Sequence, residues 1–235
     1  MSIKQLFLVL HIFCGAASLV VGLIPMLVAK GNPAHRRWGK IYAWAMLGVF
    51  VTSIILSTAL PLLNGERLNF FLFVVGIFSY YFVFTGIRAL KHSRPPKYVL
   101  PQWPDRLAAV LLAIASLGLL IYGVLFARFN PIIMVFGLVG IGLAMADLWQ
   151  YRNLVSNKPD KRRWFFTHMG RILGSYIAAF TAFLVVNIHF LPPIVVWLGP
   201  GIIGSIGISF WANRYRKKFE ATKMPLYESS TDIPV

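Results

Sequence analysis

Charged residues are scarce in this sequence, and acids are the scarcest of them. Charged side chains make up 13% of the 235 residues, with 7 Asp plus Glu against 23 Lys plus Arg. A water-soluble domain carries about a quarter. Because 58% of the residues are hydrophobic, the composition excludes both a soluble globular protein and a disordered one. The single cysteine, Cys14, excludes a disulfide framework and a cysteine-based zinc site.

The common sequence motifs of enzymes are also missing. The chain has no HEXXH, no CXXC, no P-loop and no dinucleotide fingerprint. No lysine lies in the middle of an apolar run, which excludes a retinal Schiff base. No acid lies at the expected depth of the membrane midplane, which argues against proton-coupled or sodium-coupled transport.

Long apolar runs fill most of the chain. A helix needs about 20 mostly apolar residues to cross a bilayer, and seven runs meet this length. They are 5–28, 41–63, 68–87, 107–127, 131–149, 169–190 and 193–212. Because lipid offers the backbone no hydrogen-bond partner, each run must be helical. The predicted fold class is therefore all-α: a polytopic membrane protein with one seven-transmembrane-helix domain over 1–213 and a basic, then polar, tail over 214–235.

The basic residues lie in alternate connections. Of the 23 lysines and arginines, only Lys4, Arg67 and Arg128 fall on the opposite side from the rest. The positive-inside rule then predicts the N-terminus outside and the C-terminus in the cytoplasm. Since the basic residues alternate with apolar runs, we expect membrane lipids to balance their charge and expect no nucleic-acid partner.

Few ionisable groups are predicted within the spans. Among the acids only Asp147 falls in a span, whereas Asp105 and the others are assigned to connections or to the tail. His35 and His168 each open a span on the cytoplasmic side. We predict that these two histidines lie within about 10 Å of each other, so that they can share a ligand or a water molecule.

These residues predict a metal site on the cytoplasmic side. Two imidazoles and a carboxylate, from His35, His168 and Asp147, suit a divalent metal with open coordination positions. Arg36, Arg37 and Arg171 are the predicted anion or lipid-headgroup residues. Two alternatives stay open. The histidines suit interfacial positions near lipid phosphates, and Asp147 suits an ion pair with a nearby arginine, either Arg171 or Arg152.

A second histidine pair is predicted toward the outer side. Small and polar residues follow helical spacing in two spans, and such faces line helix contacts in membranes. The first face holds His11, Gly15, Ser18 and Gly22; the second holds His168, Arg171, Ser175, Ala178, Ala182 and His189. His11 and His189 would then lie inside the bundle, as ligands of a metal or of haem iron, or as polar contacts between helices.

Two stretches resemble the signatures of a known family. The sequence HRRWGKIY from His35 to Tyr42 and the sequence HMGRILGSYIAAFTAF from His168 to Phe183 resemble two motifs of bacterial multi-pass membrane proteins that share a domain of unknown function. The resemblance covers most of residues 5–190, and His35, Arg36, His168 and Arg171 match its signature positions. It implies the bacterial inner membrane and supplies no established activity.

The sequence leaves the function open between three classes. The first is an integral membrane protein with the cytoplasmic-side metal or anion site. The second is a membrane oxidoreductase that carries haem or a metal at its histidines, and the third is a transporter of small solutes or lipids. The cofactor is accordingly a divalent metal, haem or none. The glycine-containing faces suit self-association as well as internal packing, and no partner protein can be identified.

Overall fold

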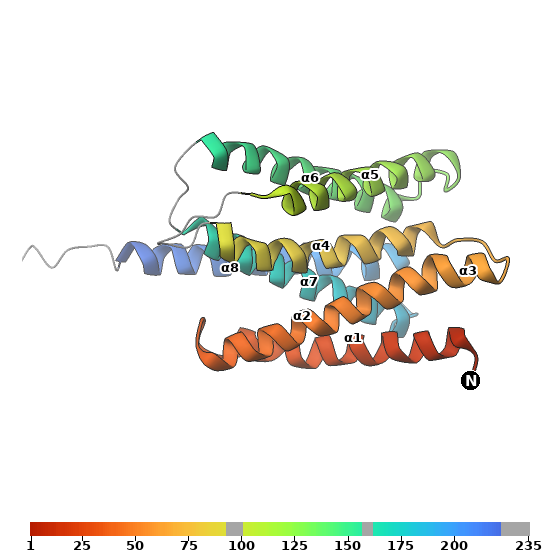
Figure 1. Cartoon of the computed structure of the whole chain (residues 1–235), viewed down its shortest axis with the longest axis horizontal. Helices are drawn as coiled ribbons and strands as arrows, with labels where there is room; N and C mark the ends of the chain where they lie inside the picture. The colour runs from red at the N-terminus through yellow and green to blue at the C-terminus, as the bar shows by residue number, and fades with distance from the viewer. Residues whose placement is uncertain (93–100, 157–161, 222–235) are drawn as a thin grey trace, which may run out of the picture.

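The chain is almost entirely helical in the part that the structure describes. The computed structural model describes residues 1–92, 101–156 and 162–221 (Figure 1). Its elements are α1 (Ile3–Leu27), α2 (Pro33–Ile54), the π-helical turn η1 (Ile55–Ala59), α3 (Leu60–Leu63), α4 (Phe70–His92), α5 (Trp103–Leu125), α6 (Pro131–Ser156), α7 (Arg163–Asn187) and α8 (Pro193–Ala221).

Seven of these helices, within the described ranges, are long and apolar enough to cross a membrane. The second of them is continuous from α2 through η1 to α3. The all-α, multi-pass fold predicted from the apolar runs is therefore confirmed. Two prolines mark helix starts as expected, because α6 begins at Pro131 and α8 at Pro193.

Several helices extend beyond the apolar runs that predicted them, among them α2, α7 and α8. α2 begins at Pro33 rather than near 41, because the Asn32 side chain caps its first turn by accepting the His35 N–H at 2.6 Å. α7 begins at Arg163 rather than near 169, and α8 continues to Ala221, into the predicted tail. These turns lie outside the apolar spans, but those of α2 and α8 are rich in arginine and lysine, which favour the helix, so these two helices continue through them.

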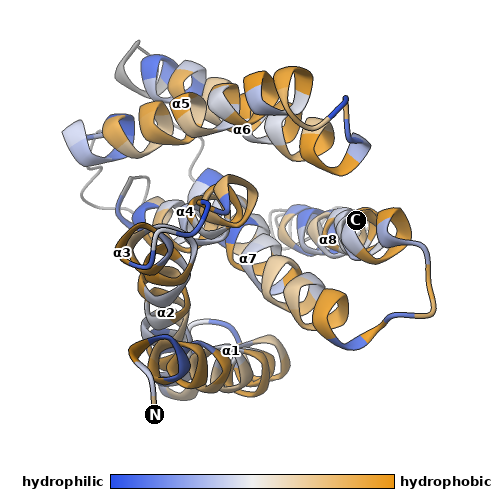
Figure 2. Cartoon of the chain, turned by 90° about the vertical axis from the view of Figure 1, so that its right-hand side faces the viewer, coloured by the Kyte–Doolittle hydropathy of each residue, from blue (hydrophilic) through white to orange (hydrophobic). Residues whose placement is uncertain are grey.

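Four helices form a ring that surrounds the candidate site. α1 packs on α2, α2 on α4, α4 on α7, and α7 on α1 (Figure 2). The hairpin of α5 and α6 lies outside this ring against α4, and α8 lies outside it against α7. α2 and α7 are therefore diagonal partners across the ring, and both run in the same direction (Figure 1).

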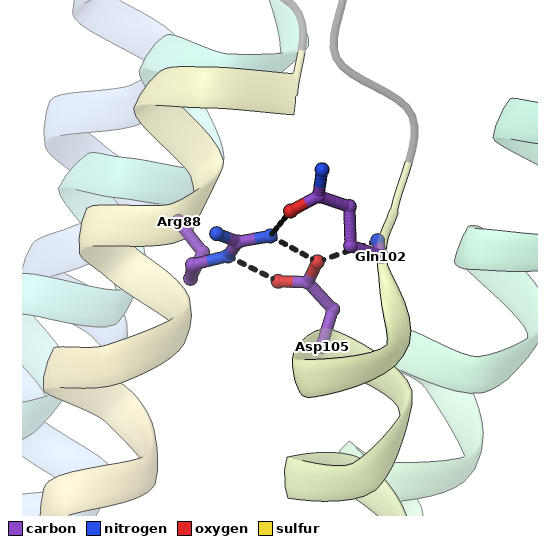
Figure 3. A network of polar contacts seen from close by, with 3 residues as sticks. All are labelled: Arg88, Gln102 and Asp105. Atoms are coloured by element: carbon purple, nitrogen blue, oxygen red, sulfur yellow. Dashed lines mark hydrogen bonds and ion pairs between the residues drawn. The ribbon is translucent and has the colours of Figure 1, made fainter.

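A buried ion pair fastens the outer hairpin to the ring (Figure 3). The Arg88 guanidinium in α4 donates to both carboxylate oxygens of Asp105, from Nε at 2.6 Å and from Nη2 at 2.5 Å. Gln102 adds its N–H to the same carboxylate at 2.8 Å. The assignment of Asp105 to a connection is therefore wrong: it lies in the first turn of α5 and is fully buried.

The predicted inward faces of α1 and α7 are confirmed only in part. Ser18 and Gly22 are buried in α1, and a Cβ at Gly22 would lie 2.8 Å from the Tyr176 ring of α7. On α7, Ser175 of the predicted face is buried, but Ala182 of that face is exposed. The two faces therefore pack closely toward the end of the bundle that carries His35 and His168.

Candidate functional site

His35 lies in the first turn of α2 and contacts the end of α1. Its Nδ1 atom is 3.0 Å from the carbonyl oxygen of Pro25. This carbonyl is available because the last carbonyls of a helix have no partner within the helix. The Lys30 ammonium binds the Pro25 carbonyl as well, at 2.9 Å, and burial lowers the pKa of this lysine.

His168 lies in the second turn of α7 and contacts α4. Its Nδ1 atom is 2.9 Å from the carbonyl oxygen of Gly86. The contact depends on the absence of a side chain at Gly86, because a Cβ there would lie 2.9 Å from Cδ1 of Ile172 and 3.1 Å from Cβ of Arg171. Glycine thus lets α7 approach α4 closely enough for the histidine to reach the backbone.

The two histidines meet across the ring of four helices. Their ring centroids are 6.4 Å apart and the ring planes are inclined by 69°, which confirms the prediction that they lie within about 10 Å. A carbonyl oxygen can only accept a hydrogen bond, so Nδ1 must carry the hydrogen on both rings. The neutral form of each ring then has its lone pair on Nε2, the atom available to a ligand.

A second contact joins α2 and α7 two turns deeper in the bundle. Tyr42 lies seven residues after His35, and Ser175 lies seven residues after His168. Their hydroxyl groups are 2.7 Å apart and both side chains are buried. Because seven residues make two helical turns, this pair lies beneath the histidines and sets the separation of the two helices there.

Asp147 belongs to a separate polar network. Its carboxylate accepts hydrogen bonds from the Tyr81 hydroxyl and from Arg171 Nη2, the latter at 2.5 Å. Among the residues described, no three His, Cys, Asp or Glu side chains form a group that could hold a metal. His35, His168 and Asp147 are therefore not brought together as the three-residue set that the sequence predicted.

Arg171 is occupied within the bundle rather than open at its surface. Besides its ion pair with Asp147, its guanidinium lies 5.6 Å from the centre of the Tyr81 ring and 5.7 Å from that of Phe82. Its side chain is 13% exposed. Arg171 is therefore the ion-pair partner of Asp147, which was one of the two alternatives for this acid. It does not occupy the surface position expected of a residue that binds lipid headgroups.

The outer histidines have different surroundings. His11 lies 2.8 Å from the Thr52 hydroxyl of α2, and that hydroxyl donates to the Gly48 carbonyl at 2.7 Å. His189 is exposed and lies beyond the end of α7 at Asn187. The helical face that was expected to place His189 beside His11 ends before it reaches this residue.

Three basic residues remain at the surface beside the histidine pair. Arg36, Arg37 and Lys40 are exposed on the first turns of α2 and line a surface hollow together with Pro33 and Ile41. Arg36 and Arg37 thus occupy the kind of position that the sequence predicted for anion or headgroup binding.

The apolar pattern of the sequence placed Asp105 in a connection and did not identify it as a buried residue of a helix. A local sequence signal could have indicated its helical position. Pro104 and Asp105 lie in the first turn of α5, and the Asp105 carboxylate accepts the N–H of Gln102 at 2.8 Å. A proline and an acid just before an apolar run are recognised start signals of helices.

Comparisons of the chain with family models, with curated proteins and with solved structures found no match. The resemblance to the bacterial membrane family therefore stays a prediction.

Proposed function

We propose that this integral membrane protein binds one transition-metal ion between His35 and His168, on the axis of its four-helix ring. The observation that carries the proposal is the pair of Nδ1 contacts, to the Pro25 carbonyl at 3.0 Å and to the Gly86 carbonyl at 2.9 Å. Metal-binding histidines usually donate their second ring N–H to a backbone carbonyl or a carboxylate, which orients the ring and fixes the tautomer.

The ligand types limit the metal. The pair offers imidazole alone, which suits copper, iron, nickel and zinc. The ring centroids lie 6.4 Å apart, so the two imidazoles are close enough to hold one ion between them. Among the divalent first-row metals, nitrogen ligands bind copper most strongly.

Haem iron is the second candidate, because the two histidines lie on diagonal helices of a four-helix ring. Such bundles hold cofactors in their cores with ligands from facing helices. Gly39, one turn after His35, has no atom within 4 Å of the position that a Cβ would take, so no neighbour crowds this turn of α2. A haem bound here would make the protein a membrane oxidoreductase, the alternative that the histidines first suggested.

A titration with defined probes tests this function. Copper(I), zinc and haemin are added separately to the metal-free, full-length protein in detergent, and their affinities are compared with those of His35→Gln and His168→Gln. Glutamine retains an N–H that can donate to the carbonyl but lacks the imidazole lone pair. His189→Gln, which changes an exposed histidine, is the matched control.

We expect one equivalent of copper or haemin to bind the wild type and the control, and at least tenfold weaker binding in the other two variants. Equal affinity in all four proteins would reject the histidine pair as a metal site.

The orientation is part of the same proposal. The uneven distribution of lysine and arginine supports a cytoplasmic position for the end that carries His35 and His168. The metal site would then face the cytoplasm of a bacterial cell.

A further inference from the structure

We propose that the first turns of α2 bind the phosphate group of an anionic phospholipid in the hollow between Arg36, Arg37 and Lys40. The hollow is also lined by Pro33 and Ile41. This site lies on the surface of α2 and does not depend on the metal proposal, whose histidine points into the ring of helices.

The cations of the hollow are exposed, and the ion pairs among the described residues leave them to an anion from outside. In residues 1–92, 101–156 and 162–221, ion pairs join Lys4 to Glu66, Arg88 to Asp105 and Arg171 to Asp147. None of them involves the three cations of the hollow. Two guanidinium groups and an ammonium suit a phosphate, because arginine binds phosphate oxygens in pairs.

A lipid suits this surface better than a free phosphate because of the face that continues from it. Arg37, Ile41, Trp44 and Val51 follow at spacings of four, seven and fourteen residues, so they share one side of α2. The three apolar side chains are 39%, 72% and 46% exposed, in this order. In a membrane, acyl chains would cover this face while the phosphate lies at the level of the cations.

The test compares two triple variants of the full-length protein in detergent. Arg36→Gln, Arg37→Gln and Lys40→Gln together remove the charges of the hollow. Arg106→Gln, Arg214→Gln and Lys217→Gln together remove the same charge from exposed positions on α5 and α8. Native mass spectrometry measures the binding of phosphatidylglycerol, of phosphatidylcholine and, in competition, of inorganic phosphate. Circular dichroism confirms that both triple variants are folded.

We expect the wild type to prefer phosphatidylglycerol and the hollow triple variant to bind it about 100-fold more weakly, since it loses the charge-assisted hydrogen bonds of two arginines and a lysine to the phosphate. The control triple variant should keep most of the affinity. An equal loss in the two triple variants, or no preference over phosphatidylcholine, would overturn the proposal. Displacement of the lipid by millimolar inorganic phosphate would also overturn it, because the site would then select a free phosphate.

Discussion

The hydroxyl groups of Tyr42 and Ser175 lie 2.7 Å apart, and each residue follows a histidine of the candidate site by seven positions. α2 and α7 therefore each carry a histidine near the end of the bundle and a hydroxyl group two turns deeper, and both groups face the centre of the ring. The lower contact holds the diagonal helices at a fixed separation and so supports the spacing of the two imidazoles above it.

Removal of the Tyr42 hydroxyl should therefore loosen the ring. Tyr42→Phe is expected to lower the free energy of unfolding by about 1 kcal/mol, because it removes a buried hydrogen bond and leaves the Ser175 oxygen without this partner. The measurement is denaturation by sodium dodecyl sulfate in mixed micelles. Tyr122→Phe is the control, since the Tyr122 hydroxyl makes no hydrogen bond to any residue within the described ranges. Equal stability of the two variants would contradict the account.

The Arg88–Asp105 pair should contribute far more than the surface pair at the other end of the bundle. Asp105 is fully buried, whereas the Lys4 and Glu66 side chains are about half exposed. Asp105→Asn leaves an arginine without its counter-charge and is expected to cost about 3 kcal/mol or more. Glu66→Gln should cost less than about 1 kcal/mol. Thermal unfolding of the two variants measures the difference, and similar losses would refute this ranking.

We expect Asp147 to be required for the stability of the fold but not for metal binding. Asp147→Asn removes the charge that Arg171 meets at 2.5 Å, so we expect a stability loss of about 3 kcal/mol or more. Copper or haemin should still bind, because the carboxylate is engaged by Tyr81 and Arg171. Titration of the folded variant checks this. If Asp147→Asn lost metal binding while its stability stayed unchanged, Asp147 would be a metal ligand and this prediction would be wrong.

The orientation of the chain can be measured with single cysteines. In a background with Cys14→Ala, Arg128→Cys should react with a membrane-impermeant maleimide in intact bacterial cells. Lys217→Cys should react only after the cells are made permeable, because the basic end is predicted to face the cytoplasm. The reverse labelling pattern would contradict the proposed topology.

The sequence predicted the parts of the site that depend on helix direction and helix start. His35 and His168 both open spans that run the same way, so their position at the same membrane surface followed from counting the spans. Their 6.4 Å separation depends on α2 and α7 facing each other across the ring, which the order of the spans does not determine. Their partners could not be predicted in this manner. The Pro25 carbonyl is available only because α1 ends near it, and the Gly86 carbonyl is reachable only because two helices pack closely at a glycine.

Other predictions failed where helix boundaries or tertiary packing decided the outcome. His189 was assigned to an inward face that ends with α7 at Asn187. Asp147 was grouped with the histidines because it lies near the same membrane surface, but depth alone does not determine which neighbour a side chain meets. In the structure it meets Tyr81, whose hydroxyl donates a hydrogen bond to it, and Arg171, whose charge neutralises its own.

The metal content of the protein as it is purified tests the central claim most directly. The wild type, His35→Gln, His168→Gln and His189→Gln are produced in cells supplied with copper, iron and a haem precursor, and purified in detergent without chelator. Elemental analysis and the absorption spectrum are then recorded. We predict close to one copper or iron, or one haem with a Soret band, for each chain of the wild type and of His189→Gln, and a loss in the other two variants. A colourless, metal-free wild type would contradict the account and would make His35 and His168 packing residues that bind the backbone of α1 and α4.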